Sequence, residues 1–185
     1  MVSRQAHNLK TPVRIRVPQQ YMQQRFDEHN QKEIAAFIIE NLSCHTQFSL
    51  GTVSQENKPW VVCLNLSYDD RINIIWKSEK ISSHSVHIQK NQHVSICIYS
   101  SNNGDFGFYA NAKAHEVLNE NELKHCLEFR FTRKGKEVPR IETFLHDSNY
   151  RIYSAELSEV WISDDRHLKT SVDLEILRTV LNQTL

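Results

Sequence analysis

Glycine, proline and cysteine are all scarce in this sequence, since the 185 residues include only 4 of each. The glycines form neither a GxGxxG nor a GxxxxGK[ST] motif, which argues against the glycine-rich loops that cradle nucleotide phosphates. The cysteines form no CxxC pair, so neither a structural zinc site nor a disulfide framework is indicated. We therefore expect a cytoplasmic protein with reduced thiols. All four cysteines are expected to be buried as small apolar residues: Cys44, Cys63, Cys97 and Cys126.

An excess of charge of one sign and long apolar runs are also absent. The 22 Lys and Arg residues balance the 22 Asp and Glu residues, so the formal net charge is zero. This balance argues against a basic nucleic-acid-binding module or a polybasic membrane module. No apolar run approaches the length of a membrane span, and the first ten residues lack the apolar stretch of a signal peptide. We expect a soluble globular protein with neither nucleic acid nor membrane as a partner.

Histidine is abundant, with ten residues, but its spacing indicates no metal site. There is no HExxH motif and no paired Cys/His set, so no bound metal is expected. A GxSxG nucleophile motif is missing too, and the cysteines have no base adjacent in sequence, so covalent catalysis has no support.

The sequence does contain a series of strand-like segments separated by polar turns. Alternating or β-branched runs predict strands over residues 47–53, 59–68, 72–77, 94–99, 106–117 and 150–163. Because tight polar turns join the first three, we expect those three to form an antiparallel meander. Closure into a small barrel would then hide the sheet edges.

Helical spacing of apolar residues predicts four helices around these strands. Their ranges are residues 19–42, 82–90, 120–131 and 170–183. Asn30 with Glu33 and Asn119 with Glu122 are spaced like capping pairs, and Ser82 is a candidate N-cap. Residues 1–18 are polar and basic and are expected to form an N-terminal arm, followed by a single domain over residues 19–185. The predicted fold class is therefore mainly β with flanking helices (α+β), built on a six-stranded antiparallel barrel.

The order of these segments resembles the pyridoxamine 5′-phosphate oxidase-like FMN-binding split-barrel family. An LGTV strand, a strand after a proline, an INIIW strand, an SSHSxxIxxN segment and a VSICIY strand follow one another as they do in that family. The resemblance covers residues 45–165 and is most recognisable over residues 78–99 (SEKISSHSVHIQKNQHVSICIY). It implies a split β-barrel that forms a homodimer and binds FMN in a groove between the subunits.

The resemblance also implies positions for the cofactor. The flavin phosphate would lie against the end of the third strand and the following short helix, because a helix N-terminus supplies free N–H groups and partial positive charge. The matching residues are Lys77, Ser78, Ser82, Ser83 and His84. The isoalloxazine ring would lie along the second strand, where Asn65 could contact its polar edge. A helix cap with polar decoration, and an outward-facing Asn65, remain the alternatives.

The sequence departs from the family where the oxidases carry four cations. Two of these stand on the second strand, where this chain has Val62 and Ser67, and two on the short helix, where it has Ser83 and His84. Two functions therefore remain open. One is a flavin-dependent oxidoreductase that uses a small-molecule substrate or electron donor. The other is a non-catalytic binding or sensor protein that holds flavin, deazaflavin or haem weakly, with His115 and His167 as candidate haem ligands.

Overall fold

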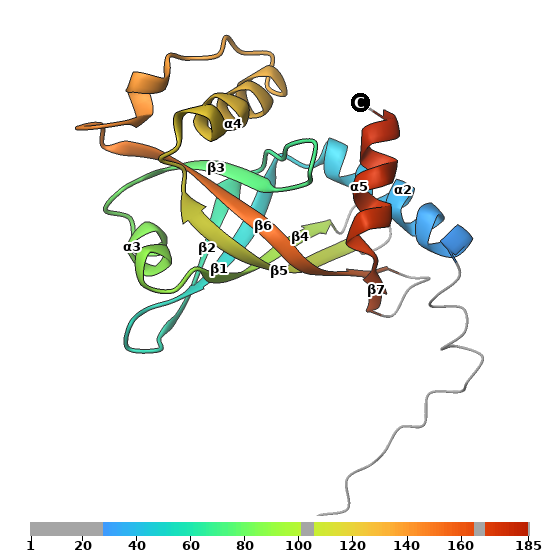
Figure 1. Ribbon diagram of the computed structural model, residues 1–185. Coiled ribbons are helices and arrows are strands. Elements are labelled where there is room, and N and C mark those ends of the chain that lie inside the picture. Colours follow the sequence, from blue (N-terminus) through green and yellow to red (C-terminus); the bar gives the residue numbers. More distant parts are fainter. Residues whose placement is uncertain (1–27, 101–105, 165–168, 185) are drawn as a thin grey trace, which may run out of the picture.

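The computed structural model describes residues 28–100, 106–164 and 169–184 (Figure 1). The strands are β1 (Gln47–Val53), β2 (Pro59–Asn65), β3 (Ile74–Glu79), β4 (His93–Ser100), β5 (Phe106–Glu116), β6 (Tyr150–Ser163) and β7 (Thr170–Val172). The helices are α2 (Glu28–Cys44), α3 (Ser83–Lys90), α4 (Glu120–Thr132), the short 3₁₀ helix η1 (Ile141–Phe144) and α5 (Leu174–Thr184). The predicted arm at residues 1–18, and residues 19–27 of the first predicted helix, lie outside the described residues.

The strands form one antiparallel sheet in the order β2-β1-β4-β5-β6-β3, and β7 pairs with β6. The mainly β class with flanking helices is confirmed, with seven strands instead of the expected six. The additional strand, β7, was predicted to be part of the C-terminal helix, which begins only at Leu174. Three residues are too few to show the alternation that identifies a strand in a sequence.

The predicted meander of the first three strands is wrong. β2 pairs with β1 along its whole length, but β3 pairs with β6, from Ile74 opposite Ala155 to Glu79 opposite Tyr150. The reason lies in the connection between β2 and β3. The Asp69 carboxylate accepts the backbone N–H groups of Arg71 and Asn73, and Ile72 adopts a φ of 62°. This tight turn directs β3 to the opposite end of the sheet order.

Alternation along the strands divides the sheet into two faces. On β1, Phe48 and Leu50 point into the barrel and are buried, whereas Ser49 and Gly51 point outward and are only partly covered. Inside the barrel, the Trp76 ring stacks on Tyr153 at 5.6 Å between centroids and meets Phe48 edge-on at 5.8 Å. The core is therefore built from the inward positions of strands that are far apart in the sequence.

The barrel closes where the two end strands of the sheet order approach each other. The Ile75 N–H donates to the carbonyl of Ser67 at 2.8 Å, and Arg130 of α4 donates to the carbonyls of Asn65 (3.5 Å) and Ile75 (3.3 Å). Arg130 is buried, and this burial lowers its pKa to about 10. A helix side chain therefore joins β2 to β3 where strand pairing is sparse.

The helices cover different ends of the sheet: α4 and α3 lie toward one side, whereas α2 and α5 lie together at the other (Figure 1).

Asn119 caps α4 as predicted, since its side chain accepts the N–H groups of Asn121 and Glu122. Ser82 occupies the N-cap position of α3, but its hydroxyl donates to the carbonyl of Glu79 instead of capping the helix. The capping pair predicted at Asn30 is wrong, because α2 is already helical from residue 28.

The predicted burial of the cysteines is largely wrong. Only Cys126 is buried; Cys44 and Cys63 are exposed and Cys97 is half-buried, although all four are free thiols. Cys63 is exposed because β2 is an edge strand and this residue lies on its outward face.

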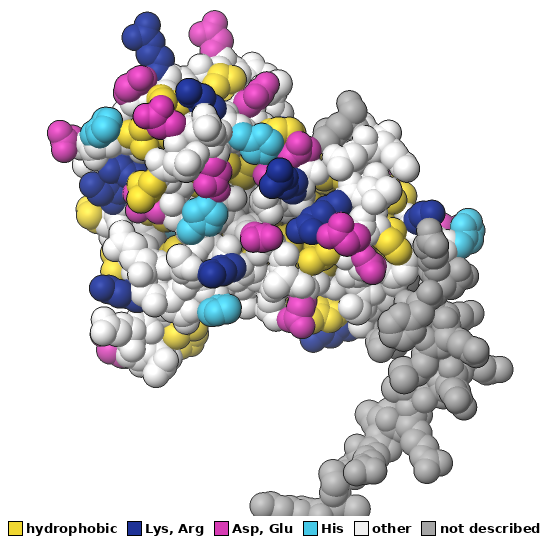
Figure 2. Space-filling view, in the orientation of Figure 1, with side chains coloured by type: hydrophobic (Ala, Val, Ile, Leu, Met, Phe, Trp, Pro, Cys, Tyr) yellow, Lys and Arg dark blue, Asp and Glu magenta, His cyan; other side chains and the backbone are white. Residues whose placement is uncertain are grey.

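None of the described helices is both long enough and apolar enough to cross a bilayer. Acidic and basic side chains intermingle over the visible face of the molecule (Figure 2).

Candidate functional site

The predicted phosphate cradle forms a compact polar cluster where β3 ends and α3 begins. His84 Nε2 is hydrogen-bonded to the hydroxyl of Ser78 and lies 3.1 Å from that of Ser82. The Ser82 hydroxyl also lies 2.8 Å from the Ser85 hydroxyl and donates to the carbonyl of Glu79 at 2.9 Å. We call Ser78, Ser82, His84 and Ser85 the serine–histidine cluster. Its members hydrogen-bond mainly to one another.

The serine–histidine cluster is neutral. Burial, and secondarily the charge of His87, lower the pKa of His84, so its imidazole is uncharged at neutral pH. His87 itself points away, with Nδ1 3.0 Å from the Thr52 hydroxyl on β1. In the part of the chain that the structure describes, no charged side chain hydrogen-bonds to this cluster. A dianionic phosphate needs cations as well as donors, and the cluster supplies only the donors.

The other predicted site residues lie apart from this cluster. Lys77 is on the opposite face of β3, with Nζ 4.4 Å above the Tyr150 ring centroid. Ser83 is exposed at the start of α3, and Asn65 is exposed at the end of β2. The structure therefore brings together Ser78, Ser82 and His84, and leaves the three others on the surface.

Of the two candidate haem ligands proposed from the sequence, only His115 lies among the described residues. His115 Nε2 is hydrogen-bonded to Glu122 Oε1 at 2.8 Å. His167 lies outside the described residues.

A basic cluster that the sequence analysis missed lies on the Lys77 side of β3. Partial desolvation, followed by the charges of neighbouring Arg and Lys residues, lowers the pKa of Lys134 to about 8. The contributing neighbours are Arg130, Lys136, Arg133 and Lys77. Because Arg130 contacts the Asn65 carbonyl, these cations gather beside the end of β2. The only signal in the sequence is the run of Lys and Arg that follows the apolar face of α4.

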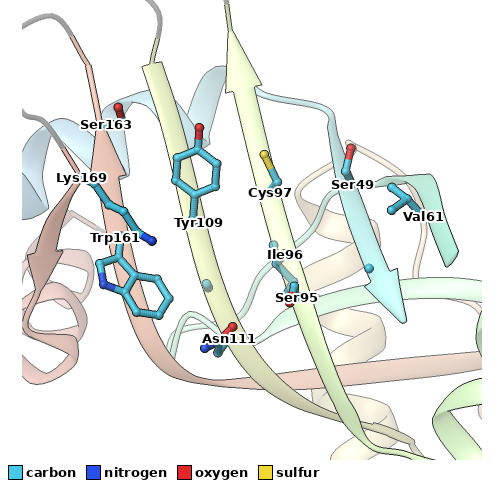
Figure 3. Close-up of a pocket in the computed structure, with 12 residues that line it drawn as sticks. Ser49, Val61, Ser95, Ile96, Cys97, Tyr109, Asn111, Trp161, Ser163 and Lys169 are labelled. Carbon is cyan, nitrogen blue, oxygen red and sulfur yellow. The ribbon is translucent and has the colours of Figure 1, made fainter. Parts of the chain in front are cut away.

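A groove with a volume of about 550 Å³ lies on the outer face of the sheet (Figure 3). We call it the outer groove. Four small residues form much of its floor on β1 and β4: Ser49, Gly51, Ser95 and Cys97. Val61 borders it on one side and the rings of Tyr109 and Trp161 on the other, with Lys169 Nζ 5.4 Å from the Trp161 ring centroid.

The strand register explains this shape. Cys63, Ser49, Cys97, Tyr109 and Trp161 lie directly opposite one another across five neighbouring strands, so their side chains form one outward-facing row. The side chains in the middle of the row are small and those at one end are bulky, and this difference in size produces the hollow. A second groove of about 480 Å³, lined by Trp60 and His93 among others, shares several walls with the first. The small outward residues at alternate positions of β1 and β4 are the sequence signal that could have revealed both.

Comparisons with known proteins identify the architecture. No protein-family model and no curated protein matches the sequence. Among solved structures, a heme binding protein from Mycobacterium smegmatis is similar with a TM-score of 0.59 and 12% identity, over 78% of this chain and 60% of that one. A candidate pyridoxamine 5′-phosphate oxidase from Listeria innocua has a TM-score of 0.54 and 17% identity, over 70% and 97% of the two chains. A pyridoxamine 5′-phosphate oxidase-related, FMN binding protein from Nostoc punctiforme has a TM-score of 0.50 and 17% identity, over 73% and 82%.

The chain has the pyridoxamine 5′-phosphate oxidase-like split-barrel fold. At these identities the likeness concerns the fold, which is the fold that the sequence resemblance implied. In this split barrel the serine–histidine cluster lies at one end of the barrel interior, whereas the outer groove lies on the opposite side of β1. The basic cluster lies at the seam between β2 and β3. The sheet separates the serine–histidine cluster from the outer groove, so one ligand cannot contact both.

Proposed function

We propose that this split-barrel protein is a homodimer that binds FMN beside β2 and uses it as a redox cofactor. The observation that carries the proposal is the outer groove, whose small floor and aromatic wall leave room for a flat ring system. Similarity in fold to an FMN binding protein supports the choice of flavin. Bound FMN would supply hydride transfer at the ring, and the protein would hold and orient it.

The dimer is proposed because the strands that border the grooves carry exposed apolar side chains. Trp60, Val61 and Tyr99 expose 46%, 67% and 57% of their surface, and all three lie on strands that border the grooves. Exposed apolar patches of this kind mark interfaces. A second copy of the chain would cover them and enclose the groove.

The ring of the flavin is proposed to lie along β2. Val61 lines the outer groove, and Cys63 and Asn65 follow it on the same face of the strand, because side chains alternate between faces. β2 is an end strand in the sheet order, so one side of its backbone has few strand partners in the described structure. Its N–H and C=O groups, with the Asn65 amide, could bind the polar edge of the ring.

The basic cluster is the best-suited binding site for the phosphate. The missing family cations leave the serine–histidine cluster neutral, whereas Lys77 and Lys134 share a strongly positive environment beside the end of β2. Lys77 would keep the phosphate-binding role that the resemblance implies, and Lys134 would replace Ser78, Ser82 and His84 in that role. Ser83, exposed at the start of α3, could add a hydroxyl donor.

Titration of the purified protein with FMN and with riboflavin tests the phosphate assignment. We expect quenching of flavin fluorescence with one flavin per chain, and binding of FMN about tenfold tighter than riboflavin because charged hydrogen bonds are strong. The double variant Lys77→Ala/Lys134→Ala should remove this difference. Lys90→Ala, at the exposed end of α3, is the matched control and should retain it. Equal affinities of the wild type for the two flavins would contradict the phosphate assignment.

The groove itself is tested by Gly51→Leu. A Cβ at Gly51 would meet only Ser95, at 3.5 Å, so a side chain fits there without strain and would occupy the floor of the groove. We expect loss of flavin binding and of the dimer in sedimentation velocity. Lys90→Leu adds the same side chain elsewhere and should change neither. FMN binding without any substrate or donor turnover would favour the non-catalytic alternative.

Haem is a second candidate cofactor, favoured by one observation. His93 lines the second groove, which shares Gly51, Val61, Ser95 and Asn111 with the first, so an imidazole ligand stands beside a surface suited to a planar ring. One protein of this fold binds heme. A Soret band on adding haem, lost in His93→Gln, would place haem before FMN.

A further inference from the structure

A second histidine cluster lies outside the sites described so far, between α4 and the connection from β2 to β3. His125 Nε2 lies 3.4 Å from Asp69 Oδ2 and 3.3 Å from Asp70 Oδ1. One ligand-type atom from each residue lies within 4.8 Å of the other two. We call these three residues the aspartate–histidine cluster.

The distances in the aspartate–histidine cluster suit a cation better than direct hydrogen bonds. His125 makes no hydrogen bond to either carboxylate in the described structure. Its Nε2 lies almost equally far from Asp69 Oδ2 and Asp70 Oδ1. Around a tetrahedral zinc ion with bonds of about 2.0–2.1 Å, neighbouring ligand atoms are about 3.3–3.4 Å apart. The two separations of His125 Nε2 from the carboxylate oxygens match edges of such a coordination shell.

The orphaned oxygen of Asp70 is a second, independent observation. Asp70 Oδ1 is shielded from solvent yet has no hydrogen-bond partner in the described structure, even though the rest of its side chain is partly exposed. A shielded carboxylate oxygen without a donor is costly. This atom faces His125, so a cation between the two would satisfy it.

The Asp69 carboxylate is held ready for a ligand. It is buried, and its oxygens accept the N–H groups of Arg71 and Asn73 and the Asn73 side-chain amide, at 2.8–3.0 Å. Hydrogen bonds of this kind orient metal ligands in advance. The two carboxylates carry a formal charge of −2, which a divalent cation would balance.

Space and neighbouring charges are compatible with an ion. Pockets of about 270 and 460 Å³ adjoin the cluster, and Asp69 and His125 line both, so water could complete the coordination. Of the neighbouring charged groups, the Arg133 guanidinium lies 3.8 Å over the Tyr68 ring and donates to the Leu42 carbonyl. The remaining charged residues that line these pockets are Arg71, Glu122, which is bonded to His115, and Glu128.

We propose that Asp69, Asp70 and His125 bind one first-row divalent cation, for which Zn²⁺ is the probe. A mixed set of imidazole and carboxylate ligands is typical of such ions. The ion would link α4 to the β2–β3 connection, next to the Arg130 contacts that close the barrel. The proposal is independent of flavin binding, because none of its residues lines the outer groove.

Calorimetric titration of the full-length, chelator-treated protein with Zn²⁺ tests the site. We expect one Zn²⁺ per chain, and a thermal midpoint that rises as Zn²⁺ is added, because a ligand that binds only the folded state stabilises it. Asp70→Asn and His125→Gln should each weaken binding about tenfold or more. Neither substitution touches the hydrogen bonds of Asp69, so both variants should fold.

His29→Gln, which replaces an exposed histidine on α2, is the matched control and should bind Zn²⁺ like the wild type. Co²⁺ gives a further readout: visible absorption bands should appear in the wild type and be absent in His125→Gln. The proposal is overturned if the wild type binds no Zn²⁺ at this stoichiometry. It is equally overturned if His29→Gln loses as much affinity as His125→Gln.

Discussion

The serine–histidine and aspartate–histidine clusters each connect a helix to the chain around β3, yet their imidazoles are used in opposite ways. His84 is buried and its Nε2 is hydrogen-bonded to neutral hydroxyls. His125 is partly exposed and stands between two carboxylates without a hydrogen bond to either. His84 therefore has hydrogen-bond partners within the fold. His125 has a ring nitrogen beside two carboxylates that could still bind a cation.

This difference teaches how to separate a structural histidine from one that can bind a ligand. The sequence favours His84, because it lies in the segment that resembles a phosphate site. The three-dimensional contacts favour His125, because an orphaned carboxylate oxygen needs a partner and a satisfied hydroxyl does not. Four predictions, in decreasing order of expected effect, test this contrast.

The first prediction concerns Asp69, the most deeply buried member of the aspartate–histidine cluster. Asp69→Ala removes a charged acceptor and leaves the N–H groups of Arg71 and Asn73 unpaired, so we expect the free energy of unfolding to fall by about 3–4 kcal/mol. Urea denaturation in the presence of a chelator measures it. Asp70→Ala is the control, with an expected change of about 0.5 kcal/mol or less. Similar losses in both variants would contradict the assigned roles.

The second prediction concerns His84. His84→Leu leaves the hydroxyls of Ser78 and Ser82 without their imidazole partner, so the free energy of unfolding should fall by about 2 kcal/mol. His93→Leu, at an exposed position, should stay within about 0.5 kcal/mol of the wild type. If His84→Leu is neutral in urea denaturation, the cluster is not the structural unit described here.

The third prediction is a pH dependence of stability that His84 imposes. Because burial lowers the pKa of His84 in the folded state, this histidine binds a proton more readily in the unfolded chain than in the folded chain. The contribution of His84 to stability should therefore be complete above about pH 6.5 and decline as the pH falls below that value. Denaturation curves from pH 7.5 to 5 should show a steeper loss for the wild type than for His84→Leu. Parallel curves would refute the prediction.

The fourth prediction has the smallest effect. In the presence of a chelator, His125→Gln should change the free energy of unfolding by about 0.5 kcal/mol or less, because His125 is partly exposed and makes no hydrogen bond to either carboxylate. The same variant should differ strongly from the wild type once Zn²⁺ is added. A large loss without metal would show that His125 has a structural role of its own.

The strand positions could be predicted because each strand carries its pattern locally. β1 and β6 have the bounds expected from the sequence, residues 47–53 and 150–163. The partner of β3 could not be predicted, because it depends on a turn at Asp69 and on a strand about 80 positions away. The exposure of Cys63 was missed for a related reason, since an apolar segment does not reveal that it is an end strand.

The candidate sites divide in the same way. Ser78, Ser82 and His84 lie within seven positions, so their meeting follows from one strand and one helix. Asp69 and His125 are 56 positions apart and meet only because α4 folds back over the β2–β3 connection. The sequence therefore predicts no metal site where the structure places three ligand atoms together. The same holds for Lys77 and Lys134 in the basic cluster.

The pairing of β3 with β6 has a consequence for how the chain folds. β1 can pair with β2 as soon as residue 65 has been made, but β3 must wait for residues 150–155 before its ladder can form. Contacts between residues so far apart in sequence form slowly, because a long loop must close first. During synthesis, Trp76 and its apolar neighbours on β3 stay without their strand partner until most of the domain has left the ribosome. Closing of the barrel is therefore expected to be the late step of folding. Substitutions in the β3–β6 ladder should slow this step more than they slow formation of the β1–β2 hairpin.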